Sequence, residues 1–294
     1  MSIFNDLKLQ FKMGDATTKL IFWNVGLFLF SILILGIQKL FRLNFDFLDF
    51  ISLSSNPKDL LWKPWSVITY AFFHSYYDIF HILFNMLLLN FSGKLFTTFF
   101  TQKQLVNFFF VSAIFGGAIY IISYVVFPGL SNQTVSLVGA SGAIMAILVA
   151  TATYQPMMEV RLVLIGNVKL IYLVLLLLVI DLIQLPMNNT GGHLAHLGGS
   201  VFGFLFVKQI ENGFDITQWF GNLIRFFEDL IEPKKRTPFK SVHVNPKKGS
   251  KPVSKIVTKD VNQQKIDLIL DKISHSGYDS LSQAEKEFLF QAGK

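Results

Sequence analysis

The sequence predicts an all-α, polytopic membrane protein, with a bundle of six transmembrane helices followed by a small helical cytoplasmic C-terminal segment. Hydrophobic residues make up 52% of the 294 residues and charged residues only 15%, whereas charged residues account for about a quarter of a soluble domain. Apolar runs of the roughly 20 residues that cross a hydrocarbon core recur along the chain. There is no cysteine, which excludes disulfides, iron-sulfur clusters and thiol chemistry.

Each of the six apolar runs is expected to cross the bilayer. The first is too long for a removable signal peptide and lacks a small-residue cleavage site, so we interpret it as a permanent anchor. The runs cover residues 20–41, 66–89, 106–127, 137–154, 168–185 and 192–210.

The distribution of positive charge orients these spans. Lys and Arg occur before the first span, between the second and third, between the fourth and fifth, and after the sixth, while the loops 128–136 and 186–191 carry no charge. Cationic loops stay on the cytoplasmic side. We therefore expect a multi-pass protein of a bacterial inner membrane with both termini in the cytoplasm.

The chain after the sixth span has three further parts. Apolar residues at helical spacing from Phe214 to Ile231 indicate an interfacial amphipathic helix or, equally well, an apolar helix docked on the bundle. The next stretch is rich in Lys, Pro and Ser and cannot bury a core; anionic lipid is a better partner for it than nucleic acid. The expected division is residues 1–19, a cytoplasmic segment; 20–211, the membrane domain; 212–232, the interfacial helix; 233–260, a basic disordered linker; and 261–294, a short helical hairpin.

The hairpin is predicted from apolar residues at helical spacing around Ile269 and from the capping-box spacing of Ser282 and Glu285. A segment this short does not fold securely alone. It is expected to dock on a partner or on the bundle.

A candidate nucleophile lies at the outer start of the fourth span, where residues 139–142 read GASG. A hydroxyl-bearing Ser141 inside a membrane has no water to satisfy it and is a functional hypothesis by default. The alternative is structural, because small residues such as Gly139 and Gly142 allow membrane helices to pack closely.

A candidate base lies in the sixth span, where His196 is part of the sequence HLAHLGG. It is about as far into its span as Ser141 is into the fourth, and both spans run inward, so the two side chains can meet. Imidazole is the base best matched to neutral pH. Gly199 and Gly203 have the small-xxx-small spacing that would bring the helices together. The alternative is a histidine satisfied by a backbone carbonyl.

A candidate oxyanion site lies in the second span, where His81 and Asn85 occur in HILFN. Residues four apart share one face of a helix, and both side chains can donate hydrogen bonds. Acyl transfer requires donors directed at the developing oxyanion, and the backbone amide of Ser141 would add another. Alternatively, the pair holds helices together.

The sequences KPWSVITYAFFH, HILFN, GASG and AHLGG, in this order, resemble those of the rhomboid intramembrane serine proteases over roughly residues 20–210. The resemblance implies a rhomboid-like six-helix bundle that needs no cofactor and no metal. It also implies that Ser141 is the nucleophile, that His196 is the general base, and that His81 and Asn85 help to stabilise the oxyanion.

Four polar or unusual positions leave alternatives open. Some rhomboids carry an aromatic residue four positions after the nucleophile, and this chain has Met145 there. Asp181 could orient His196 as a third member of a triad, although the family runs on a dyad. His74 and His193 add two imidazoles on the outer side, so a zinc-dependent membrane hydrolase is a rival function, and a non-catalytic, client-binding rhomboid-like protein is another.

The preferred interpretation is an endopeptidase that cleaves transmembrane protein substrates near the outer leaflet. A substrate segment would unwind into a water-accessible cavity. Helix-destabilising residues in it would help, because a stable helix keeps its carbonyls in its own hydrogen bonds.

Overall fold

The computed structural model describes residues 3–162, 165–231 and 257–292. The chain divides into two compact units, Met1–Pro233 and Lys234–Lys294, which are described separately. Most of the predicted basic linker lies outside the described residues. Its last residues, 257–260, are helical.

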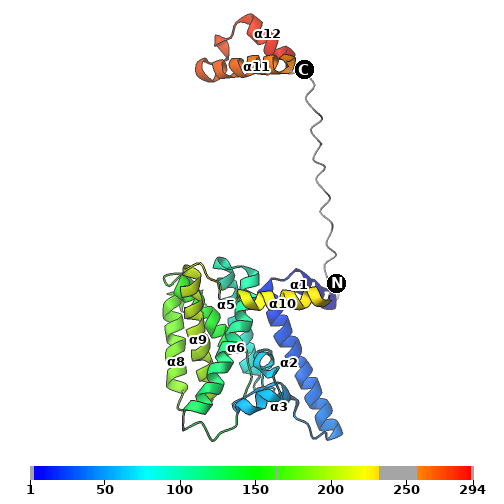
Figure 1. Cartoon of the computed structure of the whole chain (residues 1–294), viewed down its shortest axis with the longest axis vertical. Helices are drawn as coiled ribbons and strands as arrows, with labels where there is room; N and C mark the ends of the chain where they lie inside the picture. Colours follow the sequence, from blue (N-terminus) through cyan, green and yellow to red (C-terminus); the bar gives the residue numbers. More distant parts are fainter. Residues whose placement is uncertain (1–2, 163–164, 232–256, 293–294) are drawn as a thin grey trace, which may run out of the picture. The chain divides into compact units, whose positions relative to one another are not determined.

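The first unit is a bundle of helices (Figure 1). Three of them are long and apolar enough to cross a membrane, and two apolar helices among the described residues are shorter. The chain is therefore mostly helical and has membrane-spanning segments, as predicted, while the number of six spans stays a prediction. The bundle helices are α2 (Ala16–Phe41), α5 (Ile79–Phe99), α6 (Gln102–Val126), α7 (Ser141–Tyr154), α8 (Leu170–Gln184) and α9 (Thr190–Glu211).

The second predicted span is misplaced by about ten residues. Residues 66–89 do not form one helix: α4 (Ser66–Thr69) and the 3₁₀ turn η2 (Tyr70–Phe72) are followed by a loop, and α5 begins only at Ile79. Asp78 fixes this start, since its carboxylate accepts a hydrogen bond from the backbone N–H of His81 at 3.1 Å and so satisfies a free donor of the first turn.

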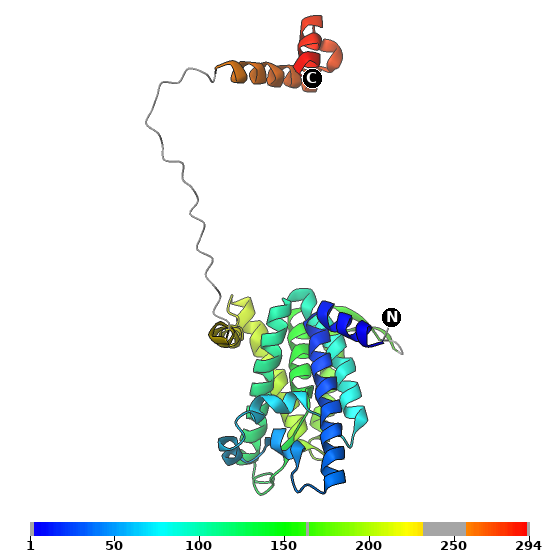
Figure 2. The same ribbon diagram turned by 90° about the vertical axis from the view of Figure 1, so that its right-hand side faces the viewer.

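Helices α1 (Ile3–Met13) and α10 (Gln218–Ile231) lie at one end of the bundle, and α3 (Phe47–Ile51) lies at the other (Figures 1 and 2). We call these the α1 end and the α3 end. At the α3 end, the two-residue strand β1 (Leu53–Ser54) pairs antiparallel with β2 (Ser136–Leu137). The η1 turn (Pro57–Leu61) follows β1.

The predicted all-α class is accurate for most of the chain but not for all of it. Besides β1 and β2, strands β3 (Glu159–Leu162) and β4 (Gly166–Lys169) form an antiparallel pair between α7 and α8. Apolar and polar residues do alternate over residues 158–162, the pattern of a half-buried strand, so the sequence carried a signal for β3.

Helix α7 forms the centre of the bundle. It packs against α9, α5, α6 and α8, and nearly all of its residues after Ser141 are buried. Aromatic rings fill the space toward the α1 end: the ring of Phe108 lies 4.6 Å from that of Phe206 and 5.1 Å from that of Phe96, measured between centroids. A helix buried on every side holds its first residue in a fixed position.

Helix α10 docks on the start of α6. The rings of Phe220 and Phe110 stack with centroids 5.0 Å apart, and the side chain of Gln104 donates a hydrogen bond to Asp215 at 3.2 Å. Other large apolar side chains of α10, including Trp219 and Phe227, are exposed. One face of this helix is therefore docked on the bundle. Its other face is apolar and exposed, and its placement at the membrane interface stays a prediction.

The second unit contains the predicted helical hairpin, which begins at residue 257 rather than at 261. Helix α11 (Val257–Ser276), a 3₁₀ turn η3 (Tyr278–Ser280) and α12 (Gln283–Ala292) enclose Ile269 and Leu281. Glu285 accepts a hydrogen bond from the backbone N–H of Ser282 at 2.7 Å and pairs with Lys272 at 3.0 Å. The predicted capping box is present.

Candidate active site

Ser141 is the first residue of α7 and follows a backbone conformation that only glycine adopts readily. Gly139 has φ of +126°, and its N–H donates to the carbonyl oxygen of Tyr70 at 2.8 Å. A Cβ at this position would lie 3.0 Å from the ring of His81. Gly139 therefore allows the segment before Ser141 to pass directly beside His81, while the expected role of Gly139 in helix packing stays a prediction.

The other three glycines do bring helices together, as predicted. A Cβ on Gly142 would lie 3.2 Å from the carbonyl oxygen of Ala195 in α9. A Cβ on Gly199 would overlap the carbonyl group of Gly142, and one on Gly203 would overlap that of Ala146. The absence of these side chains lets the backbones of α7 and α9 touch.

The close approach of α7 and α9 places Ser141 and His196 in contact. Their Oγ and Nε2 atoms are 2.7 Å apart, which is a normal hydrogen-bond length. His196 lies in the second turn of α9, and both helices begin at the α3 end. The sequence-based pairing of these two side chains is reproduced in the geometry.

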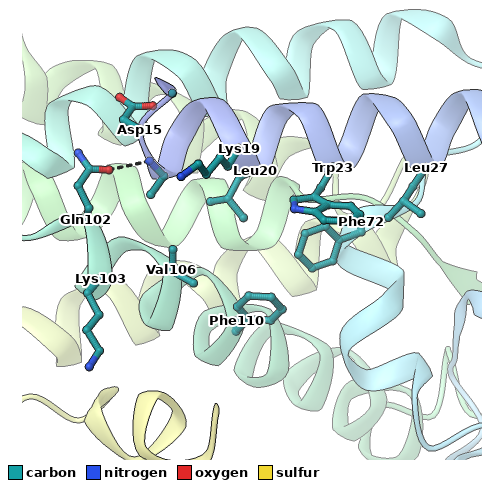
Figure 3. A pocket seen from close by; sticks show the side chains of 12 residues that line it. Asp15, Lys19, Leu20, Trp23, Leu27, Phe72, Gln102, Lys103, Val106 and Phe110 are labelled. Atoms are coloured by element: carbon teal, nitrogen blue, oxygen red, sulfur yellow. Dashed lines mark hydrogen bonds between the residues drawn. The ribbon is translucent and has the colours of Figure 1, made fainter. Parts of the chain in front are cut away.

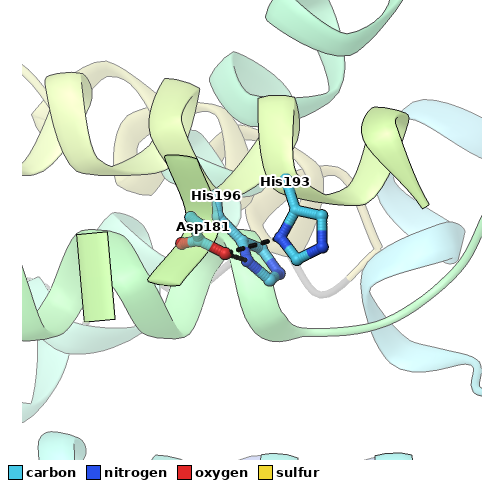
Figure 4. Close-up of side chains that lie close together, drawn as sticks. All are labelled: Asp181, His193 and His196. Atoms are coloured by element: carbon cyan, nitrogen blue, oxygen red, sulfur yellow. Dashed lines mark hydrogen bonds and ion pairs between the residues drawn. The ribbon is translucent and has the colours of Figure 1, made fainter. Parts of the chain in front are cut away.

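Asp181 also contacts His196, from the last turns of α8. Its Oδ1 atom lies 2.8 Å from Nδ1 of His196 and 2.7 Å from Nδ1 of His193 (Figure 4). A short connection, Leu185–Asn189, joins α8 to α9 and brings the three side chains together. Asp181 lies on the buried face of α8 with Leu170 and Val174.

His193 and the bridging position of Asp181 were not selected as site residues from the sequence. Two signals were available. His193 and His196 are three apart and hence share a helix face, and Asp181 recurs at helical spacing with Leu170 and Val174 in an otherwise apolar segment.

His81 and Asn85 project from the first two turns of α5. Asn85 is 4% exposed, and its Nδ2 atom has no hydrogen-bond partner among the described residues. The ring of His81 lies beside Gly139. His81 therefore faces the segment that carries Ser141. Asn85, one turn further along α5, is buried with an unpartnered donor, a costly arrangement unless a ligand uses it.

His74 lies beside His81, in the loop between η2 and α5. Its ring meets that of His81 edge to face at 5.3 Å, it is fully buried, and neither ring nitrogen has a partner among the described residues. Burial, aided by the nearby His81, lowers the pKa of His74 to about 3. It is held as a neutral imidazole.

The histidines on this side form two groups rather than one cluster. Among the described residues, Asp181, His193 and His196 offer ligand atoms that lie within 4.8 Å of one another, as a metal site requires. However, the Oδ1 to Nδ1 distances of 2.7 and 2.8 Å are shorter than the separation of about 3.3 Å between ligands of one tetrahedral zinc ion. The spacing is that of hydrogen bonds.

Met145 is buried in α7, one turn after Ser141. A groove of about 720 Å³ between α2 and α6 has a mainly apolar lining, with Trp23, Phe72 and Phe110 along it and Lys19 and Lys103 near the α1 end (Figure 3). None of the residues proposed for catalysis lines this groove.

Comparison with known proteins gives two family matches. Residues 61–210 match the rhomboid domain, and residues 257–292 match a family of unknown function, DUF6576. No curated protein matches the chain. The first match spans about half of the sequence and includes Ser141, His196, His81 and Asn85.

Proposed function

The chain is a member of the rhomboid family and a membrane protein, and from this premise we propose that it is an intramembrane serine endopeptidase. The contact of 2.7 Å between Ser141 Oγ and His196 Nε2 carries the proposal. A serine hydroxyl is a weak nucleophile until a base takes its proton. The rhomboid family includes inactive members, and this chain retains both the hydroxyl and the imidazole.

In the proposed reaction, Ser141 Oγ attacks the carbonyl carbon of a substrate peptide bond while its proton moves to Nε2 of His196. The carbonyl electron pair moves to the oxygen. When the tetrahedral intermediate collapses, the C–N bond breaks and His196 returns the proton to the departing amine. A water molecule, deprotonated by the same imidazole, then releases the acyl group and restores Ser141.

The developing oxyanion would be stabilised by the backbone N–H of Ser141 and by the side chains of Asn85 and His81. The free N–H groups of the first turn of α7 suit this role, because a helix N-terminus favours negative charge. The buried, unpartnered Nδ2 of Asn85 supports it.

The substrates proposed are transmembrane proteins, cleaved near the outer leaflet. Ser141 and His196 both lie in the first turns of helices that start at the α3 end. The positive-charge pattern assigns this end to the outer side, and both termini to the cytoplasm. The bilayer is the second partner, with anionic lipid contacting the basic tail.

The test is cleavage of a model single-span substrate by the protein in vesicles, with labelling by a fluorophosphonate probe in parallel. Ser141→Ala should abolish both readouts, and His196→Ala should reduce both by at least about a thousandfold. Gly26→Ala in α2, where a Cβ meets nothing within 4 Å, is the matched control.

The same experiment separates the rival functions. Cleavage at the parent rate by either variant would end the proposal. A folded parent protein that neither cleaves nor labels would be a client-binding member of the family. Cleavage that a chelator abolishes and that the fluorophosphonate probe does not inhibit would indicate the zinc-dependent hydrolase.

A further inference from the structure

We propose that Asp181 and His193 are positioning residues that hold the base of this enzyme in its working tautomer, so that the Ser141–His196 pair acts as part of a four-residue chain. The inference rests on the proposed function and goes beyond it, since a Ser-His dyad needs neither residue. The observation is that one carboxylate oxygen contacts both imidazoles through the same ring atom, Nδ1.

The geometry fixes where the ring protons lie. A carboxylate oxygen is an acceptor only, so Nδ1 of His196 and Nδ1 of His193 must both carry protons to bond Asp181. A neutral imidazole has one N–H. Nε2 of His196 is then unprotonated and can accept the proton of Ser141, 2.7 Å away. In the other tautomer Nε2 would carry the proton and could not act as the base.

His193 explains how a carboxylate is tolerated at this position. Asp181 is 5% exposed and lies in a strongly apolar helix, where an ionised group without hydrogen-bond donors is costly. His196 supplies one donor and His193 the other. His193 is itself 9% exposed, so its ring is held in place by the helix and by this bond.

The remaining titratable groups near His196 do not compete for this role. His81 faces it from α5 and interacts with it electrostatically, but its ring packs against Gly139. Asp78 lies near His81 and accepts from its backbone N–H. Among the described residues, Asp181 is the carboxylate within hydrogen-bonding distance of His196. It accepts a hydrogen bond throughout the reaction and takes up no proton.

The direct test is the tautomer of His196 in the intact protein. Nitrogen-15 NMR of histidine-labelled protein distinguishes a protonated ring nitrogen from an unprotonated one, and the His196→Gln variant identifies the signals of His196. We expect Nδ1 to be protonated and Nε2 unprotonated. The opposite tautomer, or signals of a metal-bound imidazole, would overturn the proposal without any need for a second variant.

Kinetics of Asp181→Asn provide the second test. An amide can present its NH₂ group to Nδ1 and so favours the wrong tautomer. We expect kcat for the model substrate to fall by about 10²- to 10⁴-fold, with KM changed by less than about threefold, and the signals of His196 to shift to the Nε2-protonated form. A residue that only filled space would change thermal stability and leave the tautomer as it was.

His193 offers a matched pair of variants. The amide of His193→Asn can occupy the place of Nδ1 and donate to Asp181, whereas His193→Leu cannot. We expect His193→Leu to lower kcat about tenfold, the order expected for one hydrogen bond to a charged group, and His193→Asn to recover most of that loss. Equal kcat values for the two variants, or parent-level kcat for Asp181→Asn, would contradict the positioning role. Loss of labelling in Ser141→Ala with no effect at Asp181 would leave the proposed function standing and this inference overturned.

Discussion

Gly199 in α9 lies directly against the carbonyl group of Gly142 in α7, with no room for a Cβ between them. In α7 this contact is made by the residue directly after Ser141, and in α9 it lies about one turn after His196. The distance between nucleophile and base therefore depends on two residues that take no part in the chemistry.

We predict that Gly199→Val forces the two helices apart. A displacement of about 1 Å at a catalytic pair can cost a hundredfold in rate, so cleavage and fluorophosphonate labelling should both fall by about that factor or more. The thermal unfolding temperature should fall as well. Gly36→Val in α2, where a Cβ meets nothing within 4 Å, should leave labelling close to the parent value. Unchanged activity of Gly199→Val would show that the close contact is not required.

Asn85→Ala tests the oxyanion assignment. Loss of one such donor typically lowers kcat by about 10²- to 10³-fold, and we expect that range here with little change in KM. The substitution should not lower thermal stability by breaking a hydrogen bond of Nδ2, because Nδ2 has no partner among the described residues. Asn107→Ala, which removes a buried asparagine near Gly221 of α10, is the control. If Asn85→Ala retains full kcat, Asn85 does not stabilise the oxyanion.

The burial of His74 leads us to predict that the folded protein loses stability in acid. Its pKa is 6.5 in the unfolded chain and about 3 in the folded protein, so between these values only the unfolded state binds the proton. The free energy of unfolding should therefore fall as the pH drops below 6.5, by up to about 1.4 kcal/mol per pH unit. His74→Phe, which cannot be protonated, should lose this part of the pH dependence.

The measurement is denaturant unfolding of the detergent-solubilised protein between pH 7.5 and 4.5. His275→Gln, on the exposed surface of α11, should behave as the parent. The same slope in the parent and in His74→Phe would mean that other groups cause the acid sensitivity.

The pairing of Ser141 with His196 could be predicted because it depends on features visible along the chain. Each residue lies at the start of an apolar run, the runs have the same direction, and small residues recur where the helices would touch. Helix order and side-chain size are properties of the sequence itself, and they were sufficient to find this contact.

The start of α5 could not be found from hydropathy. Residues 66–73 form a largely apolar run ahead of α5, and the helix boundary depends instead on the cap that Asp78 provides. The error placed His81 and Asn85 in the interior of a predicted span, whereas they lie in the first two turns of α5. Their common helix face was nevertheless correct, because it depends only on their spacing of four.

The contact of Asp181 with two histidines depends on tertiary structure. It requires the turn between α8 and α9 to fold back so that the last turns of one helix face the first turns of the other. The sequence presents Asp181 as one carboxylate in an apolar helix, and family resemblance favoured a dyad. Only the folded pair of helices α8 and α9 shows that two donors contact this carboxylate and that one of them is the candidate base.

The strand pair β1–β2 links distant parts of the α3 end. Leu53 pairs with Leu137, and two residues further on the N–H of Gly139 is held by Tyr70. The segment that precedes Ser141 is thus fastened at two points to the chain between α2 and α5. Opening this flank would displace Ser141, so we expect the flank to stay closed. If the proposed function holds, a substrate would enter the bundle from another side.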